Sequence, residues 1–358
     1  MNDRDTDLRE SCTRTLSSPR RGSARETLIR LANMPLAEKP SDYFGEGEIL
    51  RALEMRTAAI LGKEDAMFFA KGIIAQYCLL RVRSEERSSP YVVLSPMSHI
   101  DREEGNGIEV LHGLRPIRLG QHWPFTLKSL QAVSEKLCAV VVELPLRRAG
   151  YLLPSWSELE GISGWCRERG IPFHIDGARL WEAAAGYGRT PQEVASLADS
   201  VYVSFYKGLG GLAGCALAGT ADTIKAMRTW RVRLGGLTSI VSPYVLAATD
   251  GLDRQLPRMP AYVARARSLA SAIHRACICT VHPHPPHVNA FQVIFDGAVD
   301  ELTEKHRRFA TQNKVWLFNA FGVTALENRS MAEIVIGDAA DGYSDEEACG
   351  WLQSFLRS

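Results

Sequence analysis

The sequence predicts an α/β protein with a large domain built on a mainly parallel sheet and a small α/β domain at the C-terminus. Between residues 48 and 218, segments of strand composition alternate with helical patterns, which is typical of strand–helix–strand units. Residues 138–144, CAVVVEL, are an almost unbroken apolar run, as expected for a central parallel strand. A chain of 358 residues is long enough for one large and one small domain.

The composition argues against several classes of protein. The formal net charge is +1, so no excess of basic residues indicates a nucleic-acid partner. No apolar run approaches the ~20 residues of a membrane-spanning helix, so no membrane association is expected. The eight cysteines are scattered, and the pair Cys277 and Cys279 has no second pair to complete a metal site. We therefore expect a cytoplasmic protein with reduced thiols and no metal.

The first third of the chain is predicted to be a polar arm followed by helices and short strands. Residues 1–24 are polar and charged, which indicates a loose or partner-contacting arm. A large domain is then expected over residues 25–248. Apolar spacing predicts helices at 25–33 and 48–61, a strand at 66–70, a helix from 73, and strands at 91–94 and 116–119.

The remaining elements complete the large domain and build the small one, residues 249–358. The patterns predict a helix at 125–137, a strand at 138–144, a helix at 154–169 and strands at 171–175, 201–205 and 212–218. Helices interrupted near Pro243 and Pro257 follow, from 221 to about 275. Short strands at 288–295, 315–318 and 333–336 alternate with helices in the small domain.

Two charged residues follow neighbouring strands of the predicted sheet. Asp176 ends the run 171–175, and Lys207 lies after the run 201–205 and before a glycine-rich turn. Burial and nearby positive charge would lower the lysine pKa from about 10.4 and make the amine a nucleophile for an aldehyde cofactor. A carboxylate about 4 Å from a pyridinium gains about 4 kcal/mol at an effective dielectric constant near 20, enough to keep a ring nitrogen protonated. The alternative is that Asp176 caps the next helix and Lys207 is a solvated loop residue.

This pairing is what pyridoxal 5'-phosphate requires, together with donors for its phosphate. At Lys71–Gly72 a strand turns into a helix, whose free N–H groups would suit a phosphate, although most such junctions are only turns. His99 lies shortly after the strand 91–94 and is either catalytic or structural.

The segments HIDGARLW (174–181) and SFYKGLGG (204–211) resemble the threonine aldolase family, in the β-eliminating lyase group of fold type I pyridoxal-phosphate enzymes. The similarity extends from about Gly45 to Ala247, and more loosely to the C-terminus. The resemblance implies that Lys207 binds the cofactor as a Schiff base and that Asp176 pairs with the pyridine nitrogen. It also implies a homodimer or homotetramer.

Further roles follow from the same resemblance. His99 matches the histidine that stacks on the cofactor ring, where it either assists proton transfer or only packs. Arg179 matches the arginine that binds the substrate carboxylate. Gly72 and Ile73 occupy the phosphate-binding turn, and Ser204 is expected to contact the cofactor beside the lysine. Arg231 or Arg233 is a candidate to reach a neighbouring subunit's phosphate, the alternative being a surface position.

The sequence departs from the family pattern in three places. Lys71-Gly72-Ile73 lacks the usual hydroxyl residues of the phosphate turn, for which backbone N–H groups and the Lys71 charge are the available substitutes. Residues 143–148, ELPLRR, replace a Glu-Asn-Thr-His-Asn stretch, so the histidine that contacts the substrate hydroxyl has no counterpart. Residues 332–334 lack a second carboxylate-binding arginine. These departures leave the substrate open.

The resemblance predicts an aldehyde-lyase that cleaves a threonine-like β-hydroxy-α-amino acid to glycine and an aldehyde. One alternative is β-elimination or transaldol transfer on the same cofactor in a specialised pathway. Another is a non-catalytic protein of the same fold. A nicotinamide enzyme is disfavoured because no G-x-G-x-x-G follows the first strand.

Overall fold

The computed structural model describes residues 3–18 and 22–358, which belong to two compact units. The large unit is continuous and contains residues 23–257. The small unit combines the N-terminal segment up to residue 22 with residues 258–358. The sequence predicted the boundary at 248/249, inside what is helix α12 (Ser242–Arg254), whereas the units divide at 257/258, within the short helix η3 (Leu256–Arg258).

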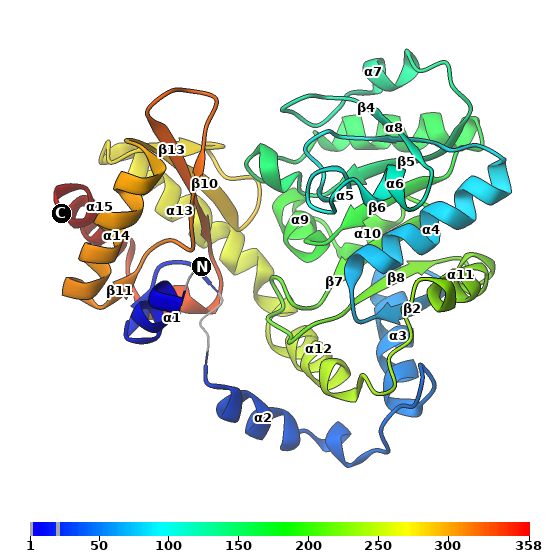
Figure 1. Ribbon diagram of the computed structural model, residues 1–358, viewed down its shortest axis with the longest axis horizontal. Coiled ribbons are helices and arrows are strands. Elements are labelled where there is room, and N and C mark those ends of the chain that lie inside the picture. The colour runs from blue at the N-terminus through cyan, green and yellow to red at the C-terminus, as the bar shows by residue number, and fades with distance from the viewer. Residues whose placement is uncertain (1–2, 19–21) are drawn as a thin grey trace. The chain divides into compact units, whose positions relative to one another are not determined.

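The large unit is built on a seven-stranded sheet with the order β2-β8-β7-β6-β5-β3-β4 (Figure 1). Strand β8 is antiparallel to both of its neighbours, and the other pairs are parallel. Six strands therefore run in one direction, and their carboxyl ends lie along one edge. The strands are β2 (Asp65–Phe69), β3 (Tyr91–Leu94), β4 (Arg115–Arg118), β5 (Leu137–Glu143), β6 (Phe173–Gly177), β7 (Ser200–Ser204) and β8 (Cys215–Gly219).

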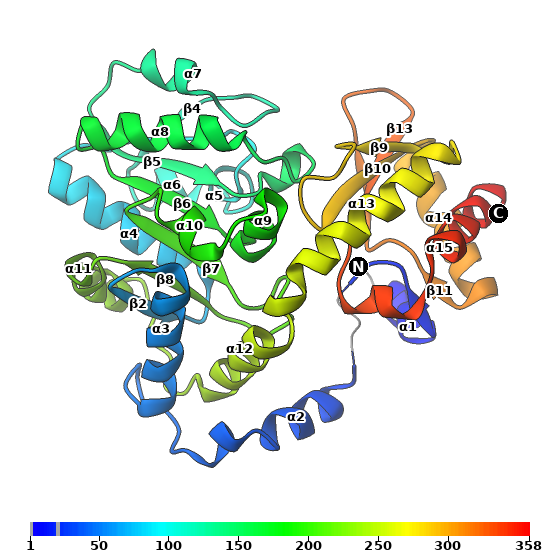
Figure 2. The same cartoon turned by 180° about the vertical axis from the view of Figure 1, so that it is seen from behind.

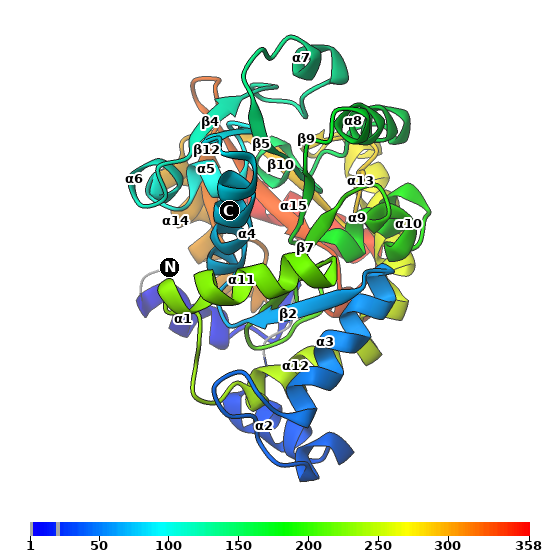
Figure 3. The same cartoon turned by 90° about the vertical axis from the view of Figure 1, so that its right-hand side faces the viewer.

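Helices cover both faces of this sheet. Helices α4 and α11 pack against each other on one face, and α3, α8, α9 and α10 lie on the other (Figures 2 and 3). The helices are α2 (Ala24–Ala32), η1 (Pro35–Glu38), α3 (Glu48–Leu61), α4 (Gly72–Arg87), α5 (His99–Arg102), α6 (Gly107–Val110), α7 (Leu127–Gln131), η2 (Arg147–Ala149), α8 (Trp156–Glu168), α9 (Leu180–Tyr187), α10 (Pro191–Ala195), α11 (Ala221–Arg233) and α12.

Local sequence explains most of these element boundaries. Helix α3 ends where Gly62 adopts a left-handed conformation, φ 62°, which glycine takes without steric cost. Helix α8 begins after Ser155, whose hydroxyl accepts the backbone N–H of Glu158. Six of the seven residues of β5 are buried, in agreement with its apolar run. The predicted α/β architecture with a mainly parallel sheet is confirmed.

The helix predicted at 125–137 is much shorter in the structure. Thr126 caps α7 by accepting the N–H of Ser129, but the helix ends at Gln131. Leu137 instead begins β5 and pairs with Tyr91 of β3. Pairing with the central sheet therefore overrides the local helical pattern at the C-terminal end of this segment.

The small unit contains a four-stranded antiparallel sheet with the order β12-β13-β10-β9. In its core, Phe295 and Phe318 make edge-to-face contacts with Phe321 and Phe355, and the rings of Phe321 and Phe355 are stacked on each other. The elements are α1 (Asp3–Glu10), β1 (Arg14–Thr15), α13 (Met259–Arg275), β9 (Thr280–His282), β10 (Ala290–Asp296), α14 (Val299–Asn313), β11 (Val315–Trp316), β12 (Phe321–Val323), β13 (Arg329–Val335), η4 (Asp338–Gly342) and α15 (Asp345–Arg357).

The N-terminal segment is part of the small unit over its described residues, where the sequence predicted a loose arm. Strand β1 pairs in parallel with β11, and α1 packs on α14. Leu16 is fully buried, and its burial together with the β1 pairing explains why the segment is ordered despite its polar composition. Residues 1–2 and 19–21 of the predicted arm lie outside the described residues. Within the described part of the chain, no helix has the length and apolar character needed to cross a bilayer.

Candidate active site

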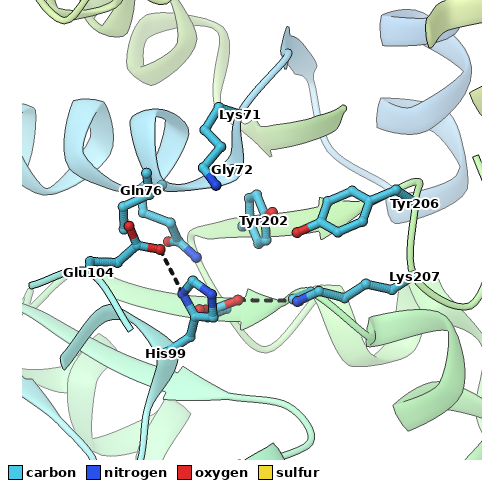
Figure 4. Close-up of a pocket in the computed structure, with 11 residues that line it drawn as sticks. Lys71, Gly72, Gln76, His99, Glu104, Tyr202, Tyr206 and Lys207 are labelled. Atoms are coloured by element: carbon cyan, nitrogen blue, oxygen red, sulfur yellow. Dashed lines mark hydrogen bonds and ion pairs between the residues drawn. The ribbon is translucent and has the colours of Figure 1, made fainter. Parts of the chain in front are cut away.

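The side chains predicted for the site come together at one edge of the large sheet. Lys71 and Gly72 follow β2, His99 follows β3, Asp176 lies near the end of β6, and Lys207 follows β7. These strands share one direction, so their carboxyl ends meet at the same edge. Figure 4 shows the cavity that they line. Its lining residues are Lys71, Gly72, Ile73, Gln76, His99, Glu104, Asp176, Ala178, Tyr202, Tyr206 and Lys207.

Lys207 lies in the turn between β7 and β8, and its amine points into this cavity (Figure 4). The turn is fixed by the backbone N–H of Gly211, which donates to the carbonyl of Phe205 at 2.8 Å. Burial, and then the positive charge of Arg179, lower the pKa of Lys207 to about 8. The carboxylate of Asp176 opposes this shift. The amine is therefore far more nucleophilic near neutral pH than an exposed lysine.

Asp176 is 3% exposed and lies beside Lys207 in the same cavity. One carboxylate oxygen accepts the backbone N–H of Ala178 at 3.2 Å, and Gln76 lines the same cavity. The pKa of Asp176 is raised, because burial outweighs the Lys207 cation, the Ala178 N–H and the Gln76 side chain, which lower it. The alternative reading of Asp176 as a simple helix cap is not what the structure shows, because Arg179 occupies the N-cap of α9 and receives no side-chain cap.

His99 begins the short helix α5 and faces the cavity from the β3 side (Figure 4). Its backbone N–H donates to Glu143 at 2.7 Å, and its Nδ1 lies 3.3 Å from Oε1 of Glu104. Burial, followed by the charge of Lys207, lowers the pKa of His99 to about 4. The imidazole is therefore neutral at physiological pH, and its Nδ1 edge faces the Glu104 carboxylate.

The N-terminus of α4 forms the opposite wall of the cavity. Lys71 is extended and has no side-chain cap, so the first N–H groups of the helix are available for an anion. The side chains of Lys71 and Tyr206 point toward the same space (Figure 4). A Cβ atom at Gly72 would clash with the hydroxyl of Tyr202 and lie 2.9 Å from its Cζ, so only glycine fits there. Lys71 and Tyr206 thus supply donors where Ile73 offers no hydroxyl.

Ser204 has a different role from the predicted cofactor contact. Its hydroxyl donates to the carbonyl of Ala178 at 2.7 Å, and its own carbonyl accepts the indole N–H of Trp181 at 3.1 Å. The side chain is fully buried and does not line the cavity. With its single hydrogen engaged, Ser204 connects the ends of β6 and β7 and has no proton to donate to a phosphate.

A second cavity adjoins the first on the side of Arg179. Its lining residues are Met97, His99, Glu103, Glu143, Arg147, Arg148, Ala178, Arg179 and Lys207. The guanidinium carbon of Arg179 lies 5.2 Å from the ring centre of Tyr151, which holds the side chain on one side. The Arg148 guanidinium pairs with Glu103 at 2.5 Å. Lys207 and His99 line both cavities, so a molecule bound to Lys207 would extend toward Arg179.

Glu143, at the end of β5, is a site residue that the sequence reasoning treated only as part of a departure from the family pattern. Its two oxygens accept the backbone N–H groups of His99, at 2.7 Å, and Arg147, at 3.1 Å. Burial and the nearby Asp176 raise the pKa of Glu143 to about 7. Glu143 could have been predicted as a site residue because it ends a strand, as Asp176 does on the neighbouring strand.

The two arginines considered for a neighbouring subunit differ in accessibility. Arg231 is 7% exposed and lines a separate cavity that also contains Glu54, so it faces the interior of its own unit. Arg233 is exposed, and its guanidinium carbon lies 4.7 Å from the ring centre of Trp230. Of the two, only Arg233 is accessible from outside.

The fold and the site define a lysine-dependent α/β enzyme in which a buried carboxylate and a low-pKa amine share one cavity. A family-wide sequence profile, described as β-eliminating lyase, matches residues 29–297. The chain belongs to this family, which confirms the resemblance found in the two sequence motifs, and it is a lyase.

Individual relatives agree with this assignment. Low-specificity L-threonine aldolase 1 of Arabidopsis thaliana is 26% identical over 313 residues, which cover 84% of this chain and 85% of that protein. Low specificity L-threonine aldolase of Escherichia coli strain K12 is 30% identical over 220 residues, 59% of this chain and 65% of that protein. A crystal structure from Listeria monocytogenes, provisionally described as an L-allo-threonine aldolase, matches with a TM-score of 0.91 and 30% identity, covering 99% of this chain and all of the other.

Proposed function

We propose that the protein binds pyridoxal 5'-phosphate and cleaves a β-hydroxy-α-amino acid of the threonine type into glycine and an aldehyde. The observation that carries this proposal is the shared cavity of Lys207 and Asp176, with the N-terminus of α4 on one side and Arg179 on the other. The large unit, residues 23–257, would be the cofactor-binding domain.

The residues around the cavity fit this cofactor by their chemistry. An aldehyde needs an amine that is neutral near physiological pH, and Lys207 has a pKa of about 8. A pyridine nitrogen needs a buried carboxylate, which Asp176 supplies. A phosphate needs N–H donors and positive charge, and the start of α4 together with Lys71 and Tyr206 offers both.

Each residue then has a defined task. Pyridoxal 5'-phosphate, when bound, supplies an aldehyde that joins to the substrate amine and a ring that accepts the electrons of the broken Cα–Cβ bond. Asp176 keeps a proton on the ring nitrogen, which sustains that electron demand. Arg179 binds the substrate carboxylate and so sets which bond at Cα lies in the reactive orientation. Lys207 accepts and returns protons at the amine position.

Glu143 is the side chain that we assign as acceptor of the β-hydroxyl proton. It lines the second cavity with Arg179 and Lys207, and its pKa of about 7 suits a base that works near neutral pH. His99 has a pKa of about 4 and lies beside Glu104, so its task is to cover one face of the ring and exclude water.

Absorbance spectroscopy and product analysis test the proposal. Purified protein with added cofactor should develop a visible absorbance band that Lys207→Ala abolishes, whereas Lys225→Ala, an exposed position on α11, should retain it. Incubation with threonine, allo-threonine and phenylserine should release an aldehyde together with glycine. Release of pyruvate and ammonia instead would indicate β-elimination, and a protein that takes up no cofactor would refute the assignment.

We further propose that the protein is a cytoplasmic homo-oligomer. Tyr43, Phe44 and Ile240 are 69%, 49% and 49% exposed, and the backbone N–H of Phe44 donates to Ser239, which brings these apolar side chains to one region of the large unit. All eight cysteines are free thiols, as in a reducing compartment. Light scattering coupled to size-exclusion chromatography measures the oligomeric state, and a monomeric mass would contradict the proposal.

A further inference from the structure

We infer that Gln76, His174 and Ser200 form a hydrogen-bonded chain that orients Asp176 and favours its ionised form. The inference rests on the proposed function, because it concerns the carboxylate that would face the cofactor nitrogen. These hydrogen-bonded side chains are buried: Gln76 and Asp176 are each 3% exposed, and His174 and Ser200 are each 1% exposed. Buried polar groups in such a position must satisfy one another.

Three secondary-structure elements bring the chain together. His174 and Asp176 are two residues apart on β6, so their side chains leave the same face of the sheet. Ser200 of β7 is the register partner of His174. Gln76 projects from the second turn of α4, whose first turn forms the phosphate side of the cavity. This hydrogen-bonded chain thus connects α4, the helix proposed to bind the phosphate, to the carboxylate of Asp176.

The direction of each hydrogen bond follows from the donors and acceptors. The Gln76 carbonyl oxygen lies 2.8 Å from Nε2 of His174, which leaves the amide nitrogen of Gln76 as the donor for Asp176 in the cavity that both residues line. A carbonyl oxygen has no hydrogen, so Nε2 of His174 must carry the proton. His174 is neutral, because burial lowers its pKa to about 3. Its Nδ1 therefore accepts a hydrogen bond from the Ser200 hydroxyl at 2.9 Å.

Protonation of Asp176 would reverse the donor and acceptor roles in this series of hydrogen bonds. A neutral carboxyl would donate its hydrogen to the Gln76 oxygen, and the turned amide would donate to Nε2 of His174. The histidine proton would then be on Nδ1, which could donate a hydrogen bond to the Ser200 carbonyl oxygen 3.0 Å away. The observed orientation of the Gln76 amide, with its oxygen toward His174, is the one that matches an ionised Asp176. The tautomer of His174 is therefore coupled to the charge of the catalytic carboxylate.

Nitrogen-15 NMR of histidine-labelled, cofactor-free protein tests the tautomer directly. His174 should carry its proton on Nε2. His306, the matched control, is 3% exposed, and its Nε2 accepts the backbone N–H groups of Leu317, at 3.1 Å, and Phe318, at 3.3 Å, so its proton should be on Nδ1. Two buried histidines with opposite tautomers would support the chain, and an Nδ1-protonated His174 at neutral pH would overturn it.

Substitutions test the consequence for the cofactor. Gln76→Met removes the donor to Asp176 at similar volume, and it should weaken pyridoxal 5'-phosphate binding about 10-fold to 100-fold while the substrate KM changes little and kcat falls. Ser200→Ala should weaken binding less, and Ser200→Thr, which keeps a hydroxyl, should restore it. Wild-type cofactor affinity in a folded Gln76→Met protein, or in Ser200→Ala with an unchanged His174 tautomer, would refute the inference.

These outcomes separate the inference from the proposed function. If the wild-type protein binds no pyridoxal 5'-phosphate, the proposed function fails, and the histidine tautomers measured without cofactor still decide whether the chain exists. If the wild type binds the cofactor but Gln76→Met binds it equally well, only the inference fails.

Discussion

The amine of Lys207 should titrate near pH 8, and two substitutions should move its midpoint in opposite directions. At a pKa of about 8, about 10% of the amine is neutral at pH 7, compared with about 0.04% for a lysine at pKa ~10.4. The reactive fraction is thus roughly 200-fold larger than for an unperturbed lysine. Arg179→Gln removes a cation that lowers the pKa, so the midpoint should rise, and Asp176→Asn removes an anion that raises it, so the midpoint should fall.

The assay is labelling of cofactor-free protein with trinitrobenzenesulfonate between pH 6 and 10, with each site quantified by peptide mass spectrometry. This reagent reacts with the neutral amine and does not depend on the pyridine nitrogen, so the Asp176→Asn protein remains measurable. Exposed Lys225 provides an internal reference in every sample. We expect shifts of at least about half a pKa unit, which corresponds to about 0.7 kcal/mol. A wild-type midpoint above pH 10, or shifts of the same sign in both variants, would refute the electrostatic account of Lys207.

Three other measurements probe the phosphate side of the cavity and the small unit. Lys71→Met should weaken pyridoxal 5'-phosphate binding about tenfold or more, whereas Ser204→Ala, which removes a hydroxyl bonded to a carbonyl, should change affinity less than threefold; equal losses in fluorescence titrations would contradict this. Gly72→Ala should destabilise the fold by about 1–3 kcal/mol in urea unfolding because its methyl group meets Tyr202, and an unchanged unfolding midpoint would contradict this. His306 has a pKa of about 4, below the unfolded value near ~6.5, so the unfolded state binds more protons and stability falls as the pH drops from about 6.5 to 4. His306→Gln should reduce that slope by up to about 1.4 kcal/mol per pH unit, and an unchanged slope would show that His306 is protonated without unfolding.

Local sequence was enough to place the strands that carry the site. Tyr91–Leu94 and the helix Glu48–Leu61 have the predicted bounds, because period and caps are encoded within each segment. The joint position of Asp176 and Lys207 followed from the rule that parallel strands end at one edge. By contrast, the helix predicted at 125–137 is shorter in the structure because Leu137 pairs with another strand. This pairing cannot be predicted from the local sequence pattern.

The missed parts of the site depend on contacts between distant segments. Gln76 meets His174 across 98 positions, and Glu143 meets the backbone of His99 across 44. Ser204 is the opposite case: it is close to Lys207 in the sequence, but its hydroxyl donates to the carbonyl of Ala178. Proximity along the chain therefore identifies which strand end a residue belongs to, but not the direction of its side chain.

The discontinuous small unit imposes an order on the synthesis of this chain. Residues 23–257 are contiguous and can fold as soon as they emerge from the ribosome. The short strand β1 emerges first, but its partner β11 is made some 300 residues later, roughly 15–60 s at ~5–20 residues per second. During that interval the nascent N-terminal segment lacks its native partner strand. The topology therefore sets the time during which chaperones that bind unpaired strands can act on it.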